Sequence, residues 1–547
     1  MIREHLTAIA VFILAFFSLT SEATNLSNDS TGQVLLYPYY NVNEGNVTFV
    51  SITNTTDVAK AAKVRFREGV SGESVFDFTL YLSPRDVWVG AVMQNGGVVK
   101  LSVPADTSCT LPNTDTLTTT DFSAARIDSA YDPDYDGTQS ADEVLARLSE
   151  GHIEVIELAD LPNTANAGDI AAAITHVQSA NPVAPADCTI PATFNDTADL
   201  GAILDSGNVT ASGVTQDFQS PGGGLMGNAA IFNASSGIYF PYNATALKTF
   251  TTNPIWWPQS DEVFSHVEGV ASDGEDSAGN AISNYRTADN GSTLPSVGGT
   301  LNRDLPDLST PSMAEVSANS SAYTAYSHVA ATGEQVINSG SFGGSVPDAK
   351  FDKASAVSAA LTARQVMGEY ITSDHYGTEW IITLPTRYTK VSSNGAQAPF
   401  TSLETATSGT ACQSVASDFW NREELQATDG VGIPEFPPTG LSALCNEVNV
   451  ISIVGALNDF SLLSSSNAVS SIAVNHYITL YIDGFNPDGW GFIDLSSNSV
   501  TPTVLTAGDA SGELQGLPLI GFIAVADIVS STQRGGVFPL RLMADEQ

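Results

Sequence analysis

The chain has few basic residues. Its 547 residues include 20 Lys and Arg against 60 Asp and Glu, which gives a formal charge of −40 at pH 7. Because phosphate groups need basic surface, this balance excludes nucleic acid as a partner. The sequence also lacks zinc-ligand histidine spacing, G-x-S-x-G and the phosphate-binding glycine motifs, and its Gly-rich run at 222–227 predicts only a loop. A catalytic triad or carboxylate pair assembled from distant segments is left open.

Long hydrophobic runs are absent after the first residues. Arg3 lies in a short charged start, Leu6 to Leu19 is apolar, and Ser21-Glu22-Ala23 has the small-x-small pattern of a cleavage site, so residues 1–23 are predicted to be a signal peptide. No later run approaches the eighteen or so apolar residues of a transmembrane helix, so we expect no transmembrane segment. The sequence therefore predicts an exported protein at the cell surface.

Cysteine is scarce. The four cysteines are Cys109, Cys188, Cys412 and Cys445. An even number in an exported chain predicts two disulfides. Four cysteines allow three pairings, of which sequence proximity favours 109 with 188 and 412 with 445. Each bond would stabilise the fold by roughly 3.5–4.5 kcal/mol in the chain-entropy picture.

Period-two alternation dominates the first hundred residues after the leader. The run "VRFRE" at 64–68 and the run "FDFTLYL" at 76–82 both alternate apolar and polar side chains, which is typical of strands. Folding the two runs together over "GVSGES" sets up a register in which every cross-strand pair is chemically compatible. This register places Phe66 opposite Phe76, Val64 opposite Phe78, and Arg65 opposite Asp77.

The whole chain is predicted to be mainly β, with antiparallel β-sandwich-like domains, long loop insertions and a few helices. We expect an N-terminal β-rich domain at 24–252 with a calcium-loop insertion, a Gly/Ser/Asp-rich excursion or linker at 253–350, and a C-terminal β-rich domain at 351–547. Residues 101–246 look like insertions on the first sheet, and the apolar and Ala positions of 354–371 predict one helix.

An acidic stretch, "DPDYDGTQSADE" at 132–143, has the D-x-[DN]-x-[DN]-G-x5-E order of an EF-hand loop. Carboxylates at this spacing can wrap a hard cation where a glycine, here Gly137, turns the chain sharply. The predicted ligands are Asp132, Asp134, Asp136, Thr138, Ser140 and Glu143. The firm helix pair of an EF-hand domain is not evident, so we predict an isolated calcium loop. The alternative interpretation is a solvated acidic turn.

Two further groups have both a functional and a structural interpretation. Trp256, Trp257 and Trp490 lie in turn-like contexts where rings could stack on sugars, although capping of the core is the favoured interpretation. The basic concentration on one strand face could meet anionic polysaccharide, although pairing within the sheet, such as Arg65 with Asp77, is favoured. These basic residues are Lys60, Lys63, Arg65 and Arg67.

Several segments from both ends of the chain resemble a group of secreted proteins of marine gammaproteobacteria. The segments are "GQVLLYPYYNVNEGNVTFVSITNTTDVAKAAKVRFREG", "DFTLYLSPRDVWVGAV", "GHIEVIEL", "TEWIITLPT", "NREE", "LCNEVNV" and "GLPLIGF". Part of that group looks like surface-layer (S-layer) proteins that tile the outer membrane. The acidic, lysine-poor composition and the acidic loop are similar to what such layers use.

This resemblance implies a structural, self-assembling, calcium-stabilised surface-layer protein of a Gram-negative cell without a catalytic site. Its main partner would be other copies of itself, with outer-membrane lipopolysaccharide as a second candidate. The alternative is a secreted glycan-binding protein or hydrolase, which a deep pocket with converging carboxylates and exposed aromatic rings would indicate. A low-copy adhesin or extracellular enzyme subunit is a third class.

Overall fold

The computed structural model describes residues 24–124, 127, 139–164, 168–180, 183–195, 208–211, 213–251, 254–256, 259, 307–308, 353–372, 376–392, 395–396, 399–400, 412–424, 443–454, 462–463, 465, 477–481, 488–496, 515–527 and 534–543. The predicted signal peptide and most of the predicted linker at 253–350 lie outside these residues. Within them, no helix is long and apolar enough to cross a membrane.

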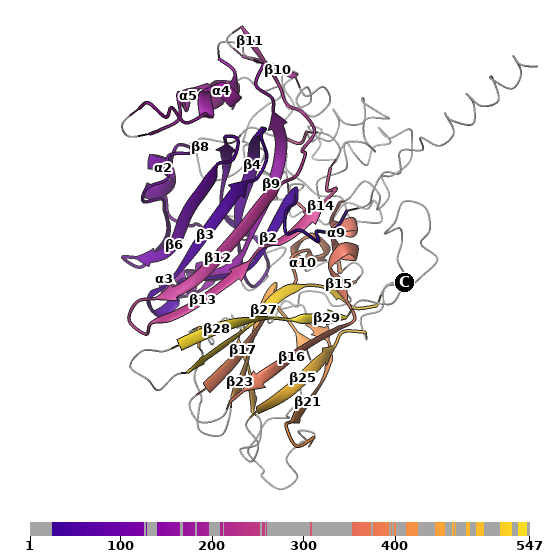
Figure 1. Ribbon diagram of the computed structural model, residues 1–547. Helices are drawn as coiled ribbons and strands as arrows, with labels where there is room; N and C mark the ends of the chain where they lie inside the picture. Colours follow the sequence, from indigo (N-terminus) through magenta and orange to yellow (C-terminus); the bar gives the residue numbers. More distant parts are fainter. Residues whose placement is uncertain are drawn as a thin grey trace, which may run out of the picture.

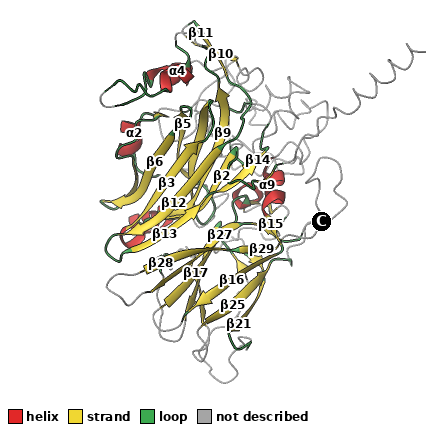
Figure 2. Ribbon diagram, viewed as in Figure 1, coloured by secondary structure: helices red, strands yellow, loops and turns green. Residues whose placement is uncertain are grey.

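The described chain is mainly β with few helices, as predicted (Figure 2). Its N-terminal half forms two large antiparallel sheets. Sheet I has the order β1-β14-β2-β9-β4-β5-β8, and sheet II has the order β13-β12-β3-β6-β7. The strands are β1 (Asn25–Leu26), β2 (Val34–Asn41), β3 (Asn46–Asn54), β4 (Ala59–Glu68), β5 (Ser74–Leu82), β6 (Val87–Asn95), β7 (Val98–Ser102), β8 (Cys109–Leu111), β9 (Glu150–Leu161), β12 (Leu225–Asn233), β13 (Ile238–Asn243) and β14 (Thr245–Lys248). A separate hairpin joins β10 (Asn208–Ala211) to β11 (Val214–Asp217).

Sheets I and II pack face to face because alternate residues of their strands are apolar. Val64, Phe66 and Phe78 of sheet I and Trp88 and Ile231 of sheet II all lie in one buried cluster. The β4–β5 hairpin has the predicted register, since Phe66 pairs with Phe76, Val64 with Phe78 and Arg65 with Asp77. This register sends the Phe side chains of both strands to the same side, where they form edge-to-face ring pairs.

The C-terminal half forms a second pair of sheets, drawn in orange and yellow in Figure 1. Sheet III has the order β21-β25-β16-β29, and sheet IV has the order β24-β23-β17-β27-β28. Their strands are β16 (Gln365–Ile371), β17 (Tyr376–Thr383), β21 (Ala416–Asn421), β23 (Val448–Val454), β24 (Tyr477–Tyr481), β25 (Asp488–Asp494), β27 (Ile520–Asp527), β28 (Arg534–Pro539) and β29 (Arg541–Met543). Shorter strands are β15 (Thr362–Ala363), β18 (Val391–Ser392), β19 (Gly395–Ala396), β20 (Gln413–Ser414), β22 (Ala443–Leu444) and β26 (Leu517–Pro518). The pair β23–β24 is parallel, whereas the other strand pairs of these two sheets are antiparallel.

Sheet IV is apolar on both faces. Trp380 and Ile523 point toward sheet III, in the buried cluster of the C-terminal half. Ile381 and Phe522, one position along, belong to the cluster that also fills the space between sheets I and II. Runs such as "WIITL" and "IGFIAVA" are therefore mostly hydrophobic rather than alternating, as expected for strands that are covered on both sides.

Close contacts join the two halves. Tyr242 of β13 stacks on Phe522 of β27 with ring centroids 4.7 Å apart. Gly535 of β28 lies so close to Phe240 that a Cβ atom there would sit 2.6 Å from the ring, so only glycine fits without a shift. Because the core is shared in this way, the two halves pack as one body.

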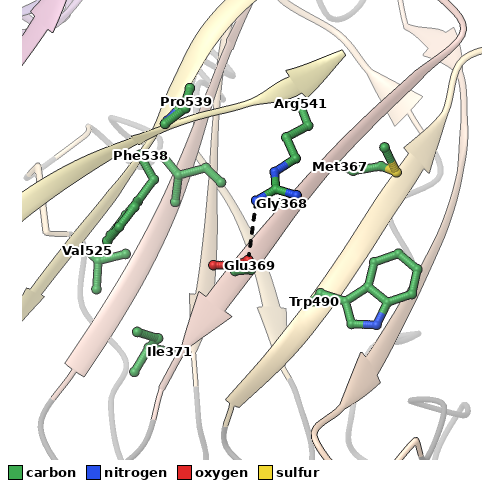
Figure 3. Close-up of a pocket in the computed structure, with 10 residues that line it drawn as sticks. Met367, Gly368, Glu369, Ile371, Trp490, Val525, Phe538, Pro539 and Arg541 are labelled. Carbon is green, nitrogen blue, oxygen red and sulfur yellow. Dashed lines mark ion pairs between the residues drawn. The ribbon is translucent and has the colours of Figure 1, made fainter. Parts of the chain in front are cut away.

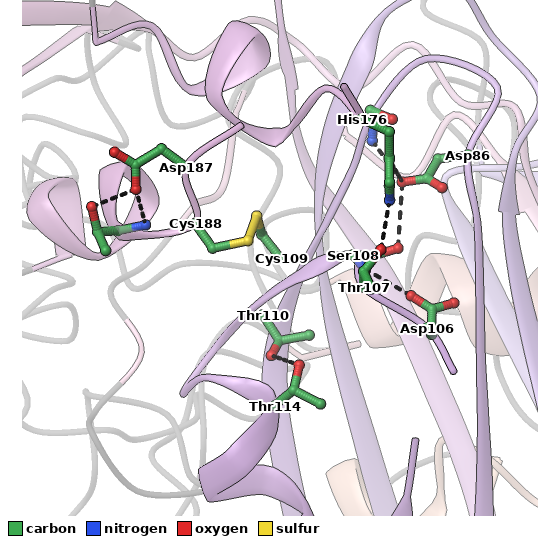
Figure 4. The surroundings of a disulfide bond; sticks show 12 residues. Asp86, Asp106, Thr107, Ser108, Cys109, Thr110, Thr114, His176, Asp187 and Cys188 are labelled. Carbon is green, nitrogen blue, oxygen red and sulfur yellow. Dashed lines mark hydrogen bonds and ion pairs between the residues drawn. A yellow bond between two sulfur atoms is a disulfide. The ribbon is translucent and has the colours of Figure 1, made fainter. Parts of the chain in front are cut away.

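Helices are few and short (Figure 2). They are η1 (Asn43–Gly45), α2 (Thr114–Thr119), α3 (Ala141–Leu148), α4 (Ile170–Ile174), α5 (Thr189–Asn195), α9 (Lys353–Leu361) and α10 (Arg387–Lys390). Disulfides join Cys109 to Cys188 and Cys412 to Cys445, the pairs that sequence proximity favoured. Figure 4 shows the first bond, which ties the segment of α4 and α5 to the edge strand β8.

Two expectations about this fold are wrong. The single helix predicted over 354–371 ends at Leu361, and β16 follows it. In β16, Val366 and Tyr370 are buried while Glu369 between them is exposed, a period of two that the Ala-rich start of the segment obscured. The strand β9, expected to be part of an insertion at 101–246, is instead central in sheet I between β2 and β4.

The basic strand face that could have met anionic polysaccharide is the polar face of β4. All ten residues of β4 are buried. Lys63, Arg65 and Arg67 form ion pairs with acidic residues of the adjacent strands and do not face water. Pairing within the sheet is therefore correct, and a basic surface for anionic polysaccharide is absent from this described strand. The acidic partners are Asp77 of β5 and Glu154 of β9.

Later segments of the chain cover this buried ionic layer. Gln259 accepts a hydrogen bond from Lys63 and donates one of 3.0 Å to Asp77. The Arg67 guanidinium lies 3.5 Å from the ring centroid of Tyr388, a cation–π contact. Asp307 is 3.9 Å from Arg67. Residues 259, 307 and 388 thus add the contacts to Lys63, Asp77 and Arg67 that sheet I alone does not provide.

The most fully bonded group at the end of β4 is Glu68. Its carboxylate receives the Arg147 guanidinium at 2.6 Å, the Ser71 hydroxyl at 2.6 Å, and the backbone N–H groups of Val70, Ser71 and Glu73 at 2.8–3.1 Å. Burial raises the pKa of Glu68, but Arg147 and these hydrogen bonds outweigh burial and lower the pKa from 4.5 to about 2. Glu68 is therefore ionised at neutral and mildly acidic pH.

We predict that Glu68→Gln lowers the free energy of unfolding by about 3–5 kcal/mol, because it removes the buried carboxylate that Arg147 faces. An unfolded Glu68 binds a proton near pH 4.5, whereas the folded one does so near pH 2. Its stabilisation is therefore present above pH 4.5 and is lost as the pH falls toward 2. Urea unfolding at pH 7 and at steps down to pH 2 should show a shallower decline for the variant than for wild type.

The control is Asp57→Asn, which removes the carboxylate of an exposed pair with Arg85. A solvent-exposed pair contributes little, so this variant should unfold like wild type. Equal effects of the two substitutions would contradict the role assigned to the buried layer.

Candidate functional site

Two of the six predicted calcium ligands lie among the described residues. Ser140 is the N-cap of α3, and its hydroxyl accepts the backbone N–H of Glu143 at 3.3 Å. The Glu143 carboxylate accepts the backbone N–H of Ser140 at 2.7 Å, which completes a capping box. The helix α3 thus begins at Ala141, within the last residues of the acidic stretch, and carries Glu143 in its first turn. Asp132, Asp134, Asp136 and Thr138 lie outside the described residues.

Metal binding by this loop stays a prediction. Within the described segments, no group of three or more His, Cys, Asp or Glu side chains is placed to hold an ion. One oxygen of the Glu143 carboxylate is engaged by the helix cap, and carboxylates have further lone pairs for a cation. The donor set is therefore compatible with a hard cation such as calcium.

The tryptophans considered as sugar-binding residues differ in their exposure to solvent. Trp256 is fully buried, and its indole N–H donates to the Tyr81 hydroxyl at 3.0 Å, so it belongs to the core. Trp257 lies outside the described residues. Trp490 has 44% of its surface exposed, so the interpretation that it caps the core is wrong. Trp490 is therefore the one candidate of the three that the structure places at the surface.

Trp490 lies on the outer face of sheet III as part of a ring stack. Because β21 and β25 pair in antiparallel register, Trp420 is directly opposite Trp490, and their ring centroids are 4.9 Å apart at an interplanar angle of 21°. Phe492 stacks on Trp420 at 5.6 Å. Trp420 thus braces Trp490 from one side, which fixes the orientation of the exposed indole.

Two cavities share Trp490 in their lining. Figure 3 shows the residues that line the first of them. The first, with a volume of about 340 Å³, lies between β16 and β28. The second, of about 630 Å³, lies toward the start of β25. Glu369 and Ile371 line both cavities with Trp490, and we call the combined hollow the aromatic groove. The other residues of the groove that matter below are Phe538, Arg541, Arg422 and Asp488.

Strand pairing explains why the groove exists. The strand β29 pairs with β16 only from Gln365 to Met367, and the cavity opens beside the rest of β16. Arg541, at the start of β29, is 3.8 Å from Glu369, and both side chains are about three-quarters exposed. Charges of both signs therefore border an aromatic surface, and solvent reaches all of them.

A different surface lies on the outside of sheet II. Along its strands, buried and exposed side chains alternate. Those that point away from the core are apolar or uncharged. Phe49 is 42%, Val89 42% and Tyr239 52% exposed. We call this surface the apolar face. It comprises Val47, Phe49, Ser51, Thr53, Val87, Val89, Ala91, Met93, Met226, Asn228, Ala230, Phe232, Tyr239, Pro241 and Asn243.

Charge is missing from the strands of the apolar face. Along β3, β6, β12 and β13, all of them described, no outward-facing residue is acidic or basic. On the adjacent β7, Lys100 pairs with Asp121 at 2.8 Å. A carboxylate reaches this face at one edge, where Asp106 accepts the backbone N–H of Val89 at 2.8 Å. Four adjacent strands without a charged residue are nevertheless unexpected in a chain of charge −40. Contiguous exposed apolar surface of this kind is typical of an interaction site.

The sequence carries a sign of the apolar face but none of the aromatic groove. In "NVTFVSITN" both alternating sets are uncharged, so neither face of β3 is marked as the solvent side. Trp420 in "DFWN" and Trp490 in "DGWGF" are separated by about 70 residues, and only the β21–β25 register brings them together.

Comparison of the chain with protein-family models, with curated proteins and with solved structures finds no match. The resemblance of its segments to surface-layer proteins is therefore a prediction from the sequence.

Calcium binding by residues 132–143 can be tested on Glu143. We predict that calcium raises the melting temperature of wild type, since a hundredfold excess over the dissociation constant contributes about 2.7 kcal/mol. Glu143→Gln should abolish most of this rise, because Gln can keep the capping box but lacks the carboxylate that closes the loop. Thermal unfolding at increasing calcium concentration measures the effect.

Asp142→Asn is the matched control, since it removes the same charge from the same helical turn. It should retain the calcium-dependent rise, because position eleven of such a loop points outward. Equal rises in wild type and both variants would mean that the loop is an ordinary acidic turn.

Proposed function

We propose that the protein is a structural cell-surface protein that self-assembles into a calcium-stabilised surface layer on a Gram-negative cell. The observation that carries the proposal is the apolar face of sheet II, because it gives a highly acidic chain one broad surface on which copies can meet. The resemblance of the sequence segments to surface-layer proteins and the two disulfides support the same function. This proposal assigns the protein no catalytic role.

Electrostatics favours the apolar face as the contact between copies. Two molecules of charge −40 repel each other, and the repulsion is strongest where carboxylates approach across a shared interface. Uncharged surface has no such local penalty, and burying Phe49, Val89 and Tyr239 removes apolar area from water. Exposure of this apolar surface to water is unfavourable, and its strands carry no charge. It is therefore suited to bind a second copy of the same chain.

Calcium has a second role in this proposal. The remaining repulsion between acidic copies falls when divalent cations bind carboxylates at or near the contacts. The acidic loop at 132–143 is the candidate site within each copy. Outer-membrane lipopolysaccharide, itself a surface of anionic groups, is the proposed anchor through the same cations.

A single charge on the apolar face should prevent assembly. Phe49 lies between Ala230 and Ala91 on the neighbouring strands, so Phe49→Glu places a carboxylate at the middle of the face and leaves the core unchanged. We expect wild type with calcium to sediment as large assemblies that form ordered arrays in electron micrographs. The Phe49→Glu variant should sediment as a monomer.

The matched control is Leu26→Glu, which puts the same charge on β1 at a residue that is 43% exposed. It should assemble like wild type. The proposal fails if Phe49→Glu forms the same arrays as wild type, or if wild type with calcium stays monomeric.

Removal of divalent cations should also reverse assembly. We expect EDTA to release the protein from cells and to dissolve its assemblies, and added calcium to restore them, because cations offset the repulsion between copies. Sedimentation before and after EDTA, with sodium chloride of equal ionic strength as the control, measures this. Assemblies that survive EDTA unchanged would exclude cation-dependent contacts.

A further inference from the structure

The aromatic groove on sheet III has a chemistry different from that of the apolar face. Trp490 exposes 44% of its surface while Trp420, stacked at 4.9 Å, covers it on one side. The groove combines this indole with carboxylates and guanidinium groups, whereas the strands of the apolar face have none. We propose that the groove binds a neutral oligosaccharide, with one pyranose ring against Trp490. This inference is independent of the proposed function.

The ring stack supplies the platform. The C–H groups on one side of a pyranose ring form an apolar surface that packs on an aromatic face. Such packing needs a ring whose orientation is fixed before the sugar arrives, because ordering a free side chain would reduce the affinity. Trp420 and Phe492 provide that support, since the three rings stack in succession across β21 and β25.

Polar groups at the rim fit sugar hydroxyls. A hydroxyl both donates and accepts hydrogen bonds, so it needs an acceptor and a donor within reach. Glu369 can accept and Arg541 can donate on the β29 side, and Asp488 and Arg422 repeat this pairing on the other side, 3.5 Å apart. Figure 3 shows Glu369 and Arg541 on the same side of the sheet as Trp490.

The dimensions and the charge favour this ligand over others. Cavities of about 340 and 630 Å³ are within the range of small-ligand sites, whereas contacts between proteins are usually flatter. Trp490 lines both cavities, so neighbouring sugar units of one chain can occupy the two cavities next to this residue. The charge of −40 disfavours an anionic polysaccharide. The groove itself carries three carboxylates, Glu369, Glu424 and Asp488, against the guanidinium groups of Arg422 and Arg541, so it too disfavours an anionic chain relative to a neutral one.

The test measures binding of maltohexaose, cellohexaose and chitohexaose by isothermal titration calorimetry, with an alginate hexamer as the anionic probe. At least one neutral hexasaccharide should bind, and more tightly than the alginate. Trp490→Ala should weaken that binding by at least about tenfold. Trp490→Tyr should recover part of the affinity, since it restores an aromatic face.

Tyr239→Ala is the control, because it removes an aromatic residue that is 52% exposed outside the groove. It should bind the sugar like wild type. Circular dichroism and thermal unfolding check that each variant is folded. Trp490→Ala should assemble like wild type and Phe49→Glu should bind sugar like wild type, so failure of one proposal leaves the other standing. No binding by any neutral hexasaccharide, tighter binding of alginate, or undiminished binding by Trp490→Ala would each overturn the inference.

Discussion

The buried ionic layer on β4 is the constraint on which the rest of the molecule depends. Taking a charged side chain out of water costs several kcal/mol unless opposite charges and hydrogen bonds replace the lost solvation. Lys63, Arg65 and Arg67 find acidic partners within sheet I, but partners alone would leave that face open to water. Residues 259, 307 and 388 close it. The N-terminal sandwich is therefore complete only when later parts of the chain have folded onto it.

The same closure explains how the two halves are joined. Sheet IV packs against sheet III on one face and contributes to the core of the N-terminal half on the other. Contacts such as Tyr242 with Phe522 extend this core across the boundary. Because sheets I and IV are covered on both sides, the outer faces of sheets II and III are the large described sheet faces left for interactions. These two faces are therefore where both proposed contacts would form.

These two faces have opposite chemistry, which separates their proposed roles. The apolar face is broad, is formed by strands without charge and would be stabilised by contact with an identical molecule. The aromatic groove is concave, carries both signs of charge and surrounds a single exposed indole. Under the two proposals, copies of the chain would associate through sheet II while sheet III would remain available to glycans. Calcium would act on the overall charge of −40.

The sequence by itself determined the strand content, the β4–β5 register and the favoured cysteine pairs, because alternation, cross-strand chemistry and proximity are local properties. It could not show that the polar face of β4 is buried, since the residues that cover it lie about 200 to 320 positions away. It also misassigned 365–371 as helix, where pairing with β25 overrides local propensity. The aromatic groove arises only from the register that brings Trp420 to Trp490. What a side chain faces is decided by which distant segments pack against it, and only tertiary structure fixes that.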